Sequence, residues 1–183
     1  MTTADYFSLG NRNDSFLNIA LRIAKFEEYR TVIIRHLSDV KLIHWDRDIR
    51  QLSAKSLAQI AKLCPTYCAS AVLPKLIEQC FHNDIVIRHG SLIGCAELVL
   101  VFGELKMLQD GGVMGDKKTA LAELVPSIEK ARLYRGRGGE VMRAAACRMI
   151  ECLCRSGLPL TVKQQVGELV SHTCGAVAML WCL

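Results

Sequence analysis

Two short stretches decide the fold of this sequence: Asp46-Arg47-Asp48-Ile49-Arg50 and Asn83-Asp84-Ile85-Val86-Ile87-Arg88. Superposing their last arginines, Arg50 on Arg88, also aligns Asp46 with Asp84. An aspartate at a helix start accepts hydrogen bonds from free backbone N–H groups, and a residue four positions later lies on the same face. The pattern therefore predicts that both stretches begin helices.

A third copy, Glu140-Val141-Met142-Arg143-Ala144-Ala145-Ala146, follows after a longer interval, with Arg143 at the arginine position. A longer helix before it and a Gly-rich loop near residues 110–117 account for the extra length. Helix pairs that recur at intervals of about 40 residues are typical of HEAT-type repeats. We predict an all-α HEAT/armadillo-type α-solenoid of antiparallel helix pairs. It has about three pairs and a leading half repeat over residues 1–165, and an atypical tail over 166–183.

The apolar residues repeat at helical intervals along most of the chain. Steps of three and four recur in 16–24, 32–40, 49–61, 121–128 and 141–153, and no convincing strand pattern flanked by hairpin turns occurs. In such a solenoid we expect Asp46, Arg50, Asp84 and Arg88 to stack one repeat on the next, with each arginine reaching a neighbouring acid.

Composition excludes several classes of protein. With 51% hydrophobic and 22% charged residues, the 183-residue chain can bury a core and is neither disordered nor collagen-like. A net charge of +5 is below that of most dedicated nucleic-acid binders, so no nucleic-acid partner is expected. No signal peptide is visible, and the apolar runs 92–102 and 174–183 are too short to span a membrane. The nine cysteines lie mostly in helix-like runs, which indicates a cytoplasmic chain with reduced thiols.

No set of residues predicts catalysis, a cofactor or a metal site. The segment from Gly111 to Thr119 lacks the spacing and the preceding strand of a phosphate-binding loop. Cys64, Cys68, Cys80 and His82 lack the paired spacing of a zinc site and are expected to be mostly core residues, as are Cys147, Cys152 and Cys154. The stretches His44-Trp45-Asp46 and His89-Gly90-Ser91 carry no nucleophile motif. We therefore predict a non-enzymatic protein.

One loop is a candidate binding surface for a protein partner. Arg132, Tyr134, Arg135 and Arg137 surround a glycine cluster just before the third long helix. Arginines with an interleaved tyrosine are typical of interfaces and can hold an acidic segment. A flexible turn with solvated arginines is an equally good interpretation.

Several strings resemble tubulin-folding cofactor D, the family of tubulin-specific chaperones. They are Asp5-Tyr6-Phe7-Ser8-Leu9-Gly10-Asn11-Arg12, His44-Trp45-Asp46, Ile87-Arg88-His89-Gly90-Ser91, Cys95-Ala96-Glu97, and the run from Leu133 through Arg143. The resemblance covers about residues 4–165, and family members are several times longer than this chain.

The resemblance implies a solenoid that binds β-tubulin after its release from the chaperonin. It also implies partnership with cofactors C and E and with an ADP-ribosylation-factor-like small GTPase, and stimulation of GTP hydrolysis on tubulin. The expected location is the cytoplasm and the microtubule cytoskeleton. The alternative is a generic HEAT-repeat interaction scaffold without tubulin specificity.

Overall fold

The computed structural model of the chain describes residues 12–109, 114–136 and 138–158. Within these ranges all regular structure is helical, so the predicted all-α class is confirmed. The elements in chain order are α2 (Arg12–Asp14), η1 (Ser15–Ile19), α3 (Ala20–Ala24), α4 (Glu27–His36), η2 (Leu37–Lys41), α5 (Arg47–Ala61), α6 (Pro65–Tyr67), η3 (Cys68–Val72), α7 (Leu73–Gln79), α8 (Ile85–Glu104), α9 (Lys117–Ala122), α10 (Leu124–Lys130) and α11 (Gly139–Ser156), where η marks a π-helical turn.

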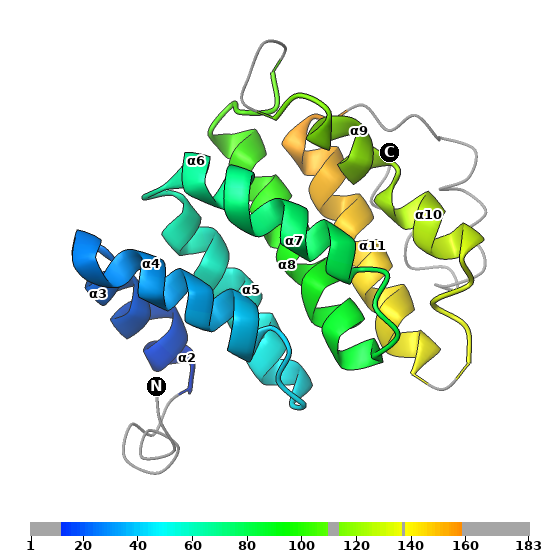
Figure 1. The fold of residues 1–183 in the computed structure, drawn as a ribbon, viewed down its shortest axis with the longest axis horizontal. Helices are drawn as coiled ribbons and strands as arrows, with labels where there is room; N and C mark the ends of the chain where they lie inside the picture. Colours follow the sequence, from blue (N-terminus) through cyan, green and yellow to red (C-terminus); the bar gives the residue numbers. More distant parts are fainter. Residues whose placement is uncertain (1–11, 110–113, 137, 159–183) are drawn as a thin grey trace.

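The helices form two layers of antiparallel pairs (Figure 1). Helices α3, α5, α8 and α11 follow one another in one layer, and each contacts the next. The η2 segment that ends the α4 helix packs on α5, α7 packs on α8, and α10 packs on α11. This succession of helix pairs is that of an all-α solenoid. The predicted boundary between residues 165 and 166, and the tail beyond it, lie outside the described residues.

Helix α8 lies at the centre of the stack. It packs between α5 and α11 and also against α7, which buries apolar residues around its whole circumference. Among the described residues it is the one helix long and apolar enough to cross a membrane, and 72% of its most apolar window is buried inside the protein. Packing against neighbouring helices accounts for this composition, because a helix covered on every side has no polar face.

Glycine lets α8 lie close to the helix of the preceding pair. A Cβ atom built on Gly90 would overlap the carbonyl oxygen of Leu42. One turn later, a Cβ atom on Gly94 would meet Leu42 Cδ1 at 2.9 Å and Leu76 Cδ1 at 3.1 Å. The chain at the end of η2 thus occupies the space that a side chain at Gly90 would need, which brings two consecutive pairs into contact.

Candidate protein-binding site

The two repeated aspartates begin their helices as the sequence predicts. Asp46 and Asp84 have extended backbones with φ of −74° and are the N-caps of α5 and α8. Their carboxylates accept hydrogen bonds from the N–H groups of Asp48 at 2.9 Å and Val86 at 2.8 Å. Asp46 also forms an ion pair with Arg12, with 2.9 Å between Oδ2 and Nη1. Each cap satisfies a backbone donor that the helix itself cannot.

A histidine and an arginine complete the same turn in both repeats. His44 Nδ1 accepts a hydrogen bond from the N–H of Asp46 at 3.0 Å, and His82 Nδ1 accepts one from that of Asp84 at 2.9 Å. The pattern His-x-Asp-x-x-x-Arg therefore occurs at the start of both helices. The superposition of Arg50 on Arg88 also aligns His44 with His82, so these two residues belong to the repeated pattern that the aspartates and arginines indicate.

The arginines of this pattern bind backbone carbonyls. Arg50 Nη1 donates to the carbonyl oxygens of His44 at 2.7 Å and Trp45 at 2.9 Å. Arg88 Nη1 does the same toward His82 at 2.5 Å and Asn83 at 3.1 Å. Among the described residues neither arginine forms an ion pair. The expectation that each arginine reaches a neighbouring acid is therefore wrong. The carbonyl groups of the turn before each helix lie closer to the guanidinium than any acid in the described ranges does.

Arg50 also joins two consecutive repeats. Its Nε donates to His89 Nδ1 on α8 at 3.0 Å, and both side chains are buried. Burial, followed by the positive charges of Arg50 and Arg47, lowers the pKa of His89 to about 3, so its ring is neutral. A guanidinium can only donate hydrogen bonds, so the His89 Nδ1 atom that accepts from Arg50 carries no proton. The single proton of the neutral ring therefore lies on Nε2. The predicted stacking role of Asp46, Asp84 and Arg88 stays a prediction.

The third repeat departs from the pattern. Helix α11 begins after Gly138, whose backbone is left-handed, and no side chain caps it. The backbone N–H of Met142 bonds to the carbonyl of Gly138, as that of Arg50 bonds to Asp46. Counted from the N-cap, the buried Met142 lies where Arg50 lies in α5, one residue before Arg143. Arg143 Nη1 nevertheless donates to the carbonyl oxygen of Tyr134 at 3.5 Å, the kind of contact that Arg50 and Arg88 make, so the alignment of Arg143 with these arginines stays a prediction. Among the described residues the buried Nε of Arg88 has no hydrogen-bond partner, whereas that of Arg50 donates to His89.

The predicted basic loop lies between α10 and α11. Arg132 and Arg135 are exposed, and Arg132 has a positive φ of 58°. Tyr134 is half-buried against the core, and its hydroxyl donates to Glu129 Oε1 at 3.1 Å. Arg137 lies outside the described residues. The structure thus presents two of the three predicted arginines to solvent, while the tyrosine hydroxyl is bonded within the chain.

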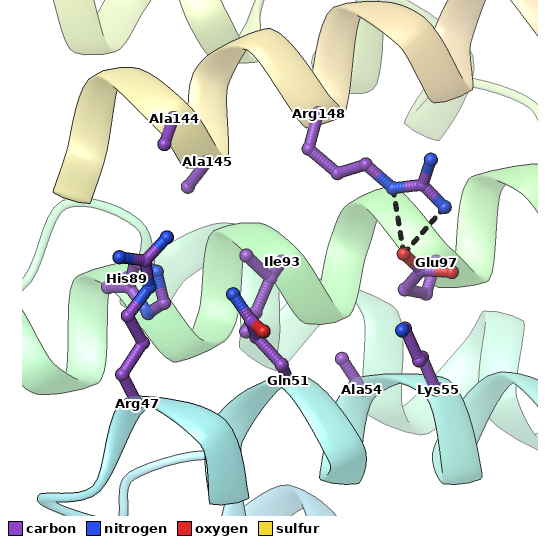
Figure 2. A pocket seen from close by; sticks show the side chains of 10 residues that line it. All are labelled: Arg47, Gln51, Ala54, Lys55, His89, Ile93, Glu97, Ala144, Ala145 and Arg148. Atoms are coloured by element: carbon purple, nitrogen blue, oxygen red, sulfur yellow. Dashed lines mark hydrogen bonds and ion pairs between the residues drawn. The ribbon is translucent and has the colours of Figure 1, made fainter.

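A groove that the sequence argument missed crosses α5, α8 and α11 (Figure 2). Its volume is about 340 Å³, within the size range of ligand sites. Across it Arg148 binds Glu97, with Nε at 2.9 Å and Nη2 at 2.8 Å from the same oxygen. No local motif predicts this groove, because three helices contribute to it. The lining residues are Arg47, Gln51, Ala54, Lys55, His89, Ile93, Glu97, Ala144, Ala145 and Arg148.

The other candidate residues have structural surroundings. Cys68 and Cys80 are fully buried, and burial raises the pKa of the Cys80 thiol. Within the described ranges no three metal-binding side chains come together. The Ser91 hydroxyl donates to Gln79 Oε1 at 3.2 Å, so it is bonded to an amide rather than to a base. Cys154, expected as a core residue, is exposed.

Comparison with known proteins confirms the resemblance seen in the sequence. The chain is 28% identical over 158 residues, or 84% of its length, to tubulin-specific chaperone D of Dictyostelium discoideum. It is 26% identical over 95 residues, or 52% of its length, to tubulin-folding cofactor D of Schizosaccharomyces pombe. The matches cover 10% and 8% of those relatives' lengths. No family profile and no solved structure matches the chain.

Proposed function

We propose that the chain is part of a tubulin-specific chaperone that binds β-tubulin during the assembly of the αβ-tubulin heterodimer. The observation that carries this proposal is the similarity to tubulin-specific chaperone D, which extends over 84% of the chain. A match over 158 residues is far longer than any single motif, so the similarity concerns most of the chain.

The architecture supports binding over a broad surface. Stacked helix pairs present a long face, and stable protein interfaces bury roughly 1,200–2,000 Å² in total. Arg132 and Arg135 are exposed on the loop before α11, where they can attract an acidic partner. The proposed role needs no catalytic group in this chain.

The further partners and effects are part of the same proposal. We propose that the complete chaperone works with cofactors C and E and with an ADP-ribosylation-factor-like small GTPase in the cytoplasm and at the microtubule cytoskeleton. Stimulation of GTP hydrolysis would then act on the nucleotide held by tubulin. Since affinity in large interfaces is distributed over several repeats, this chain alone is expected to give no such stimulation.

The test is direct binding of the purified chain to β-tubulin, compared with an equally acidic unrelated protein. We expect selective retention of β-tubulin and a weaker signal for the double variant Arg132→Glu/Arg135→Glu. The matched control is Arg22→Glu/Lys25→Glu, which changes the charge equally at exposed positions on α3 and its C-cap. Equal retention of both proteins would overturn the tubulin assignment and favour a generic HEAT-repeat scaffold.

A further inference from the structure

The groove across α5, α8 and α11 is hollow because short side chains line it. Ala54 and Ala145 are buried in its walls, and Ile93 of α8 forms part of the floor between them. Ala144 lies at the surface of α11. A long side chain at Ala144 would occupy this space, so the alanines of α11 keep the groove open toward solvent.

Two cations stand along the α5 side of the groove without acidic partners. Arg47 and Lys55 are exposed, and neither forms an ion pair with any described residue. They are eight residues apart, which is about 12 Å along a helix axis at 1.5 Å per residue. Gln51 lies one turn from each, so the three side chains share one face of α5.

The described residues on the opposite side of the groove offer no free negative charge. Among the described lining residues the only carboxylate belongs to Glu97, whose side chain is 13% exposed and bound by Arg148. Arg148 also binds Glu151 at 2.8 Å, so this cluster is satisfied internally. At the other end lies His89, a neutral ring beside Arg47. The unbalanced charge of the groove is therefore that of Arg47 and Lys55.

We propose that this groove binds an extended acidic segment of a partner protein, with Arg47 and Lys55 each pairing with a carboxylate. Side chains on one face of an extended chain repeat every two residues, and four residues span about 13 Å. This length matches the separation of the two cations, so the carboxylates stand at positions i and i+4. Gln51 faces the residue between them and hydrogen-bonds the peptide backbone.

A protein segment fits better than a nucleic acid. Single-stranded nucleic acids are held by basic grooves in which aromatic side chains stack on the bases. Within the part of the chain that the structure describes, the lining of this groove includes no Phe, Tyr or Trp and only two unpaired cations. The proposal is independent of tubulin, since it rests on the shape and the charge of the groove.

The test uses the 183-residue chain and a fluorescein-labelled peptide in which glutamate and serine alternate. Binding is followed by fluorescence anisotropy at low and at physiological ionic strength. We expect saturable binding that salt weakens. The charge reversal Arg47→Glu/Lys55→Glu should reduce affinity about tenfold or more, because like charges then oppose the peptide. Ala144→Trp should also weaken binding, because it fills the groove without changing the charge.

The controls separate the groove from general charge attraction. Arg22→Glu/Lys25→Glu alters the net charge as much as the groove reversal and should leave the peptide affinity unchanged. Circular dichroism establishes that each variant is folded. The proposal is overturned if the groove reversal binds the peptide like the unaltered chain, or if the control weakens binding equally. Tighter binding of an oligouridylate than of the peptide would also overturn it.

Discussion

Replacing each repeat arginine by alanine should destabilise the protein to different degrees. Arg50 and Arg88 are 5% and 8% exposed, and each donates from Nη1 to two carbonyls of the preceding turn. Only Arg50 makes an additional bond, from Nε to His89. A hydrogen bond to a charged group contributes about 1.5–3 kcal/mol. From this bond alone, Arg50→Ala should lower the free energy of unfolding by about 1.5–3 kcal/mol more than Arg88→Ala.

The unpartnered Nε of Arg88 widens this difference. A buried donor without an acceptor costs about 1–3 kcal/mol, and Arg88→Ala removes that cost together with the favourable bonds. The free energy of unfolding therefore falls less for Arg88→Ala than for Arg50→Ala. An arginine-to-alanine change also removes packing of the aliphatic stem, but this contribution is common to both positions and cancels in the comparison.

Urea denaturation at neutral pH measures both variants, and a double-mutant cycle isolates the bond. Combining Arg50→Ala with His89→Ala should give a coupling energy of about 1.5–3 kcal/mol. The control cycle of Arg88→Ala with His89→Ala should give a coupling near zero. Equal losses for the two arginines, or a coupling near zero for Arg50 and His89, would refute the assignment of this bond as the link between repeats.

Two further predictions concern the same region. Gly90→Ala should lower the free energy of unfolding in urea denaturation by on the order of 3 kcal/mol, because its Cβ would overlap the Leu42 carbonyl. Gly94→Ala should lower it less, since its Cβ would meet only the ends of leucine side chains. His89 has its pKa lowered from 6.5 to about 3, so unfolding takes up a proton between these values. Stability from this site is complete above pH 6.5 and falls at lower pH by up to about 1.4 kcal/mol per unit. His89→Asn, which keeps an acceptor for Arg50, should flatten this dependence; an unchanged slope between pH 5 and 6.5 would contradict a neutral buried ring.

The sequence predicted the helix starts because their chemistry is local. Asp46 and Asp84 bond to N–H groups two residues away, and such contacts follow from residue type and spacing alone. The third helix was also expected, but counting from its N-cap shifts the register by one residue relative to the alignment of Arg143. Its N-cap is Gly138 rather than an acid, so the alignment relied on Arg143, which binds a carbonyl of the preceding loop but lies five residues after the N-cap instead of four.

The partners of the arginines and the groove needed the structure. Sequence spacing indicates which side chains share a face, but it does not show that backbone carbonyls of the preceding turn lie nearer to Arg50 than any acid. The groove depends on residues as far apart as Arg47 and Arg148, which only the packing of three helices brings together. Arg137, which the sequence argument placed in a binding loop, lies outside the described residues.

Helix α8 uses different polar links at its junctions with α5 and with α11, and the difference follows from one position. Between α5 and α8 the buried link is Arg50 with His89. Between α8 and α11 the arginine position is filled by Met142, and an ion pair of Glu97 with Arg148 supplies the polar contact instead. His89 and Glu97 line the groove, and each already accepts a hydrogen bond within its link. Arg50 donates to His89 Nδ1, and Arg148 binds the Glu97 carboxylate. The contacts that stack the repeats thus leave Arg47 with no acidic partner among the described residues, and its charge remains available to a partner protein.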